Sequence, residues 1–69
     1  MRKVRIRNEI RRLRFEHGEM TQQELADQVG CTRQTIAMLE AERYVPSLGL
    51  AMLIAETFGR TVDEIFTRA

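Results

Sequence analysis

The side chains that carry most enzyme chemistry are scarce in this sequence. It contains one histidine, His17, one cysteine, Cys31, and no glycine-rich loop of the kind that binds phosphate groups. These residues supply neither a nucleophile with a matching base nor a cluster of metal ligands, and a single cysteine excludes an internal disulfide. We therefore expect no catalytic residues, no metal site and no cofactor.

A second set of polar residues suits hydrogen bonding rather than catalysis. Residues 22–41 read QQELADQVGCTRQTIAMLEA, where Ala26 and Gly30 fall at the crossing and the turn of two short helices. The apolar residues that would fill the wedge between these helices are Leu25, Val29, Cys31, Ile36 and Leu39. With those faces buried, Arg33 and Gln34 project from the start of the second helix. This pattern predicts a helix-turn-helix that presents Arg33 and Gln34 to a DNA major groove.

The elements that position these residues are five predicted short helices. They span about residues 6–17, 22–29, 33–42, 48–58 and 62–66. Capping boxes at Thr21 with Glu24 and at Thr61 with Glu64 mark two of the starts. Before the first helix, apolar and basic residues alternate, which is equally compatible with a short extended arm or an edge strand. The sequence thus indicates a single all-α domain over residues 1–69, with a basic arm over about residues 1–6.

Charge is distributed unevenly along the chain. The formal net charge is +1, yet residues 1–14 contain seven basic residues and one acidic residue. A basic end beside an acidic body suggests a polyanion or an acidic partner, although a run of arginines also fits a solvated helix face. Arg2, Lys3 and Arg5 are candidates for an arm that reaches the DNA backbone or minor groove.

Length and hydropathy narrow the class of protein further. With 69 residues, the chain has too little core for a large enzyme fold. The longest uncharged stretch, residues 44–55, contains Pro46 and is shorter than the roughly 20 apolar residues that span a bilayer. The N-terminus is charged where a secretory signal would be apolar. We expect a cytoplasmic protein with no membrane association.

Residues from Leu13 to Phe66 resemble the phage-repressor-type, or Cro and XRE-like, helix-turn-helix transcriptional regulators. The resemblance rests on three segments, TQQELADQVGCTRQTIAMLE, YVPSLGLAMLIAETFG and VDEIF. It implies a compact five-helix, lambda-repressor-like domain that binds double-stranded operator DNA as a homodimer and performs no catalysis.

The resemblance also implies roles for individual residues. Arg33 and Gln34 match the first two base-reading positions, and their chemistry suits guanine and adenine respectively. Met38 matches a third reading position, where an apolar side chain could touch a thymine methyl group. The implied phosphate contacts are Gln22, Gln23, Thr35, Arg43, Tyr44 and Ser47. Met38 is equally compatible with core packing. One departure is that Ala41 and Glu42 replace the Asn-Gly that often follows the recognition helix.

A homodimer is also expected because the interface of one domain with DNA is small. One recognition helix with a few phosphate contacts gives little specific affinity, whereas a two-fold dimer reads an inverted repeat. The expected dimer surface consists of apolar residues near the C-terminus, some of which we expect in the core instead, namely Leu53, Val62, Ile65 and Phe66. Such a dimer would occlude a promoter, which favours repression, and no small-molecule effector is evident.

The alternative is an antitoxin-like or other partner-binding protein whose DNA binding is auxiliary. The modest net charge fits this alternative. Small antitoxins, however, usually add a segment that wraps the partner, and little sequence follows Phe66. The sequence therefore favours a DNA-binding regulator.

Overall fold

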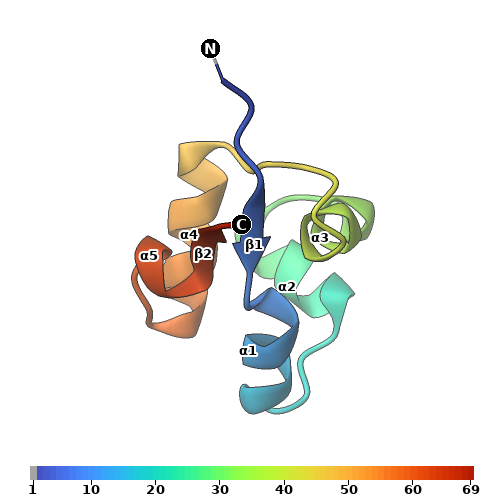
Figure 1. Ribbon diagram of the computed structural model, residues 1–69. Coiled ribbons are helices and arrows are strands. Elements are labelled where there is room, and N and C mark those ends of the chain that lie inside the picture. The colour runs from blue at the N-terminus through green and yellow to red at the C-terminus, as the bar shows by residue number, and fades with distance from the viewer. Residues whose placement is uncertain (1) are drawn as a thin grey trace.

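The computed structural model describes residues 2–69, which form five short helices and two short strands (Figure 1). The number of helices matches the prediction, and together they form a helical domain that contains a helix-turn-helix. In chain order the elements are β1 (Ile6–Asn8), α1 (Ile10–Glu16), α2 (Gln22–Val29), α3 (Arg33–Glu40), α4 (Leu48–Phe58), α5 (Val62–Ile65) and β2 (Phe66–Arg68).

A two-stranded antiparallel sheet joins the two ends of the chain. Strand β1 pairs with β2 so that Arg7 lies opposite Thr67, and the amide of Glu9 donates to the carbonyl of Ile65 at 3.0 Å. The edge-strand alternative is therefore the one observed for residues 6–8. Figure 1 shows this sheet in front of the helices, with the N-terminal segment leaving the body beyond β1.

The strands correct the predicted ends of two helices. The first helix begins at Ile10 rather than near residue 6, because residues 6–8 bond to β2 and Asn8 Oδ1 accepts from the Ile10 amide at 3.2 Å. The last helix ends at Ile65 rather than at Phe66, whose backbone is extended and belongs to β2. Hydropathy alone missed both ends because apolar residues continue from each helix into its neighbouring strand.

The third helix is also shorter than predicted. It ends at Glu40 rather than at residue 42. Glu42 has a φ of 61°, in the left-handed region that glycine adopts more readily, and the Arg43 amide then donates to the carbonyl of Met38 at 2.9 Å. This conformation stops the helix and turns the chain into the linker of residues 41–47.

The predicted capping boxes are both present. Thr21 Oγ1 accepts from the Glu24 amide at 3.0 Å, and the Glu24 carboxylate accepts from the Thr21 amide at 2.9 Å. Thr61 and Glu64 form the same pair of bonds at 3.2 and 2.9 Å. These caps fix where α2 and α5 begin.

The core lies between the helix-turn-helix and the remaining helices. The inward faces of α2 and α3 are buried as predicted, at Leu25, Ala26, Val29, Ile36 and Leu39. They pack against Ile10 and Leu13 of α1, Ile54, Ala55 and Phe58 of α4, and Ile65 of α5. Because both apolar faces of the helix-turn-helix point inward, only its polar face remains accessible.

Candidate nucleic-acid interface

The start of α3 is held so that its polar side chains face solvent. Thr32 caps the helix by accepting from the Thr35 amide at 3.2 Å, while Ile36 and Leu39 anchor the inner face. Arg33 and Gln34 are exposed. Both side chains therefore project into solvent from the N-terminal end of α3.

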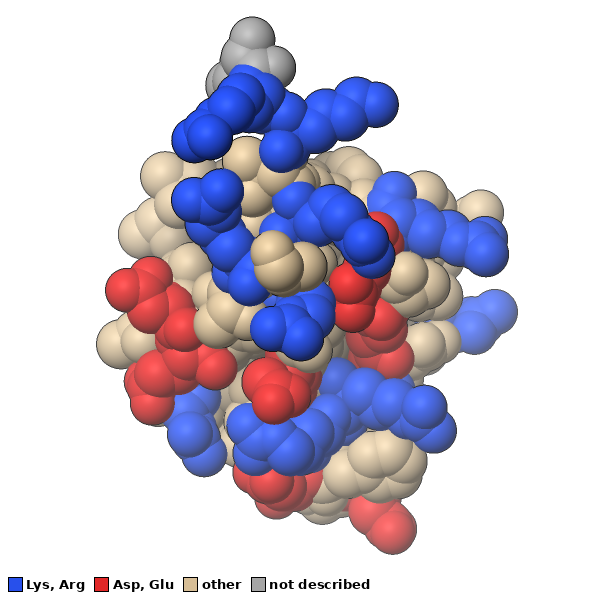
Figure 2. All heavy atoms as spheres, in the orientation of Figure 1, with Lys and Arg blue, Asp and Glu red and all other residues tan. Residues whose placement is uncertain are grey.

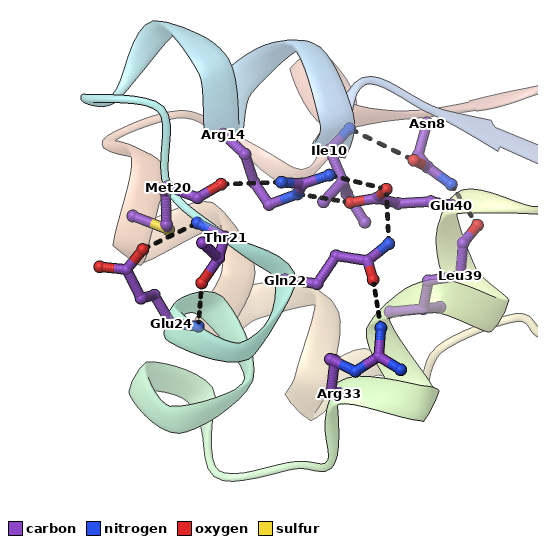
Figure 3. A network of polar contacts seen from close by, with 10 residues as sticks. All are labelled: Asn8, Ile10, Arg14, Met20, Thr21, Gln22, Glu24, Arg33, Leu39 and Glu40. Atoms are coloured by element: carbon purple, nitrogen blue, oxygen red, sulfur yellow. Dashed lines mark hydrogen bonds and ion pairs between the residues drawn. The ribbon is translucent and has the colours of Figure 1, made fainter.

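Arg33 is also held from one side by α2. Its Nη1 donates to Gln22 Oε1 at 3.2 Å, and Gln22 Nε2 donates to Glu40 Oε1 at 3.1 Å (Figure 3). The structure thus brings together a predicted base-reading residue and a predicted phosphate contact. It joins both to Glu40, which the sequence analysis did not single out.

Glu40 forms an ion pair with Arg14 beneath the helix-turn-helix. Arg14 Nε and Nη2 donate to the two carboxylate oxygens at 2.7 and 3.0 Å, and the side chains of Arg14 and Glu40 are 10% and 11% exposed. Arg14 Nη1 also donates to the carbonyl of Met20 at 2.7 Å. Most of the basic N-terminal run is exposed, so Arg14 is a structural exception within it.

Asn8 anchors the other end of the recognition helix. Its Nδ2 donates to the carbonyl of Leu39 at 2.7 Å, in the last turn of α3. The contacts that tie Asn8 and Glu40 to α3 and α1 carry no local sequence signal, because Asn8 lies 31 residues from Leu39 and Glu40 lies 26 residues from Arg14.

The other predicted contact residues lie on exposed or half-buried surface. Met38 is 38% exposed, and Arg43 and Tyr44 are exposed in the linker. Gln23 Nε2 donates to Asp27 on its own helix at 2.8 Å. Ser47 Oγ accepts a hydrogen bond from the Leu50 amide at 3.1 Å, and this bond caps α4. The hydroxyl hydrogen of Ser47 remains free to donate.

Basic side chains gather over the N-terminal segment and around β1, with acidic side chains between them (Figure 2). Arg2, Lys3 and Arg5 are exposed, and Arg5 Nη2 lies 3.9 Å from Glu42 Oε1 in the linker after α3. The basic segment therefore reaches the linker that follows the recognition helix.

The predicted dimer residues do not all lie on the surface. Leu53 is exposed, and Val62 and Phe66 are half-buried. Ile65 is 0% exposed and belongs to the core, so its place in the predicted dimer surface was wrong. Hydropathy did not distinguish Ile65 from Val62, because both are apolar residues of the short helix α5.

A shallow apolar hollow lies beside these residues. It has a volume of about 250 Å³. Its lining comes from both strands, the linker and two helices, and consists of Ile6, Val45, Pro46, Leu48, Ala51, Val62 and Phe66. Leu48 stands at its edge with 71% of its surface exposed, and Val45 is also exposed.

Cys31 packs against the core as a structural thiol. Its Sγ lies 3.6 Å from the carbonyl of Thr32. Burial raises the pKa of this thiol, so it is protonated and weakly nucleophilic at neutral pH.

Two other features, a metal site and a membrane-spanning helix, are not found in residues 2–69. This part of the chain has no group of three or more histidine, cysteine or acidic side chains placed to bind a metal. It also has no helix with the length and apolarity needed to cross a membrane.

Comparisons with known proteins agree with the presence of a helix-turn-helix. A family model described as helix-turn-helix matches residues 10–65. An uncharacterized HTH-type transcriptional regulator of Methanothermobacter thermautotrophicus is 53% identical over 62 residues, which cover 88% of each chain. Another from Archaeoglobus fulgidus is 46% identical over 61 residues, covering 88% of this chain and 86% of the relative.

A solved structure supports the fold alone. A provisionally assigned DNA-binding protein from Bacteroides fragilis superposes with a TM-score of 0.75 at 22% identity, covering 90% of this chain and 98% of that one. The match extends over nearly the whole domain, including the helix-turn-helix.

Proposed function

This chain belongs to the Cro/C1-type, or XRE-like, helix-turn-helix family, and on that premise we propose that it regulates transcription by binding a specific double-stranded DNA operator. Its relatives are HTH-type transcriptional regulators. The proposed operator is an inverted repeat, bound in the major groove by a homodimer. Repression is the proposed outcome, because a dimer on a promoter blocks access to the DNA.

The observation that carries the proposal is the exposed start of α3. Arg33 and Gln34 face solvent while the opposite side of the helix is buried in the core. An arginine suits guanine O6 and N7, and a glutamine suits adenine N6 and N7. Met38, one turn further, offers an apolar contact for a thymine methyl group.

Phosphate contacts would flank this helix. Their proposed donors are exposed or partly exposed side chains of α2, α3 and the linker, namely Gln22, Gln23, Thr35, Arg43, Tyr44 and Ser47. Arg2, Lys3 and Arg5 would add sequence-independent attraction.

The proposed homodimer uses the apolar hollow between the sheet, the linker and α4. A two-fold interface needs a projection and a recess on the same surface. Leu48 projects beside a recess lined by Val45, Val62 and Phe66. Leu53 is also exposed on this helix, but it does not line the hollow. A second copy docked here would place its own Leu48 in the recess of the first.

Selection from a random pool of duplexes tests the proposal, at about 150 mM salt so that purely electrostatic binding is weak. We expect enrichment of an inverted repeat with half-sites about one helical turn apart. Enrichment of a single half-site would contradict the dimer. No enrichment by the folded protein would contradict sequence-specific binding and favour a partner-binding role.

A further inference from the structure

Gln22 lies between two groups with opposite hydrogen-bonding character. Glu40, when ionised, only accepts hydrogen bonds, and Arg33 only donates them. Gln22 bonds to both, through Nε2 to Glu40 at 3.1 Å and through Oε1 to Arg33 at 3.2 Å. We infer that Glu40 and Gln22 are positioning residues that fix the Arg33 guanidinium and thereby sharpen its choice of base. The inference rests on the proposed function, in which Arg33 reads a base edge.

The amide of Gln22 has one favourable orientation. Turning it by half a rotation would place its NH₂ group against the Arg33 guanidinium and its oxygen against the Glu40 carboxylate. Both hydrogen bonds would then be replaced by repulsive contacts. The charged neighbours thus settle the amide orientation, which is ordinarily ambiguous for a glutamine side chain.

The acceptor that orients Gln22 is itself fixed. Glu40 accepts two hydrogen bonds from Arg14, and both side chains are about nine-tenths buried. A planar guanidinium paired in this way with a carboxylate restricts the rotation of both groups. Figure 3 shows the resulting chain of contacts, which runs from Arg14 through Glu40 and Gln22 to Arg33.

Arg33 remains able to bind a base while Gln22 holds it. A guanidinium has five N–H donors, and the bond to Gln22 uses one on Nη1. The donors on Nη2 and Nε are left for a bidentate contact with guanine. A side chain fixed in advance loses less conformational freedom on binding, and it tolerates a wrongly placed acceptor poorly.

This role makes a different prediction from a simple phosphate contact. Removing a phosphate contact weakens binding to all sequences alike, whereas removing the positioning of Arg33 reduces discrimination at the one base pair that Arg33 faces. The base-preference profile therefore separates the two roles. Overall affinity alone does not.

The test measures that profile for Gln22→Met, which keeps the side-chain length and removes both hydrogen bonds. Gln28→Met is the matched control, because Gln28 is exposed on the same helix and is not among the proposed DNA contacts. We expect Gln22→Met to lower discrimination at the Arg33 base pair about 5- to 10-fold, a part of what a bidentate contact supplies. Gln28→Met should leave the profile unchanged. A loss of affinity that is equal for all sequences, as the phosphate contact of Gln22 alone would give, or no change at all, would overturn the inference.

Two further variants show whether the effect passes through the proposed chain. In an Arg33→Ala background, Gln22→Met should change the profile no further. Glu40→Gln, checked for folding by circular dichroism, should relax the same base pair, because Gln22 could then adopt either amide orientation. A relaxed preference at another position would overturn the inference. If the wild-type protein enriches no sequence, the proposed function fails and the inference with it; an enriched site with an unchanged Gln22→Met profile refutes the inference alone.

Discussion

Two basic regions of this molecule are held very differently. Arg33, in the helix-turn-helix, is connected through Gln22 and Glu40 to the buried Arg14. Arg5, in the N-terminal segment, has a side chain that is 82% exposed and approaches Glu42 only to 3.9 Å. A fixed cation suits selection among base edges, and an exposed one suits attraction to any phosphate. We therefore propose that the first region supplies specificity and the second sequence-independent affinity.

The largest expected effect comes from breaking the support of the fixed region. Arg14→Met leaves the Glu40 carboxylate buried without its partner, so we expect a loss of about 3 kcal/mol in the free energy of unfolding. Urea denaturation measures this loss. The double variant Arg14→Met with Glu40→Leu should recover most of the stability, because it leaves no unpaired charge. A single variant as stable as the wild type would show that the ion pair does not anchor α3.

Removing charge from the exposed region should weaken binding without altering sequence preference. The triple variant Arg2→Ala, Lys3→Ala and Arg5→Ala should lower the slope of log affinity against log salt by about 0.9 for each phosphate that the segment neutralises. Titrations of specific and random duplexes at several salt concentrations measure it. Arg60→Ala is the control, since Arg60 lies 3.8 Å from Glu64 near α5. An unchanged slope would assign the segment a purely structural role.

A smaller effect is expected where the two regions meet. Glu42 has a left-handed backbone conformation, so Glu42→Gly should stabilise the fold by about 1 kcal/mol. The change also removes the carboxylate beside Arg5 and should therefore tighten DNA binding. Glu19→Gly is the control, because Glu19 has a similar φ of 54° in the turn before α2. That variant should gain stability with DNA affinity unchanged. Equal gains in affinity for the two variants would contradict a local effect of Glu42.

The smallest expected effect concerns the capping boxes. The backbone amide of Thr21 donates a hydrogen bond to the Glu24 carboxylate and holds the pKa of Glu24 below its ordinary value. The backbone amide of Thr61 does the same for Glu64. A carboxylate with a lowered pKa stabilises the fold at pH values above its ordinary pKa. This stability is lost as the pH falls through the pKa of the folded state. Thermal unfolding of Glu24→Gln with Glu64→Gln should therefore depend less on pH between about pH 5 and pH 3. A pH dependence as steep as that of the wild type would contradict this assignment.

Local signals predicted the elements, and distant contacts decided the rest. A capping box placed α2 and the Ser47 cap placed α4, each together with apolar spacing, because these signals depend on neighbours within a few residues. The pairing of β1 with β2 joins residues about 60 positions apart, and no local pattern encodes it. The same reason hid Glu40, whose partner Arg14 lies 26 residues earlier. Ile65 was placed on the surface because hydropathy does not tell which apolar side of a short helix is covered.

The candidate site divides in the same way. Arg33 and Gln34 were predictable, because a helix whose inner face is apolar must expose its remaining side chains. The bond from Arg33 to Gln22 depends on how α2 and α3 cross, which the spacing of residues does not specify. The sequence therefore indicated which residues face solvent at the start of α3. It did not indicate which of them are held in place.

The most direct test of this account compares the sequences selected by the wild-type protein and by Arg33→Ala. The account predicts that the variant folds normally and loses preference at one base pair in each half-site, with a cost of about 1–3 kcal/mol there, while the other positions keep theirs. An Arg33→Ala protein that selects the same operator with the same profile would contradict the assignment of specificity to the helix-turn-helix.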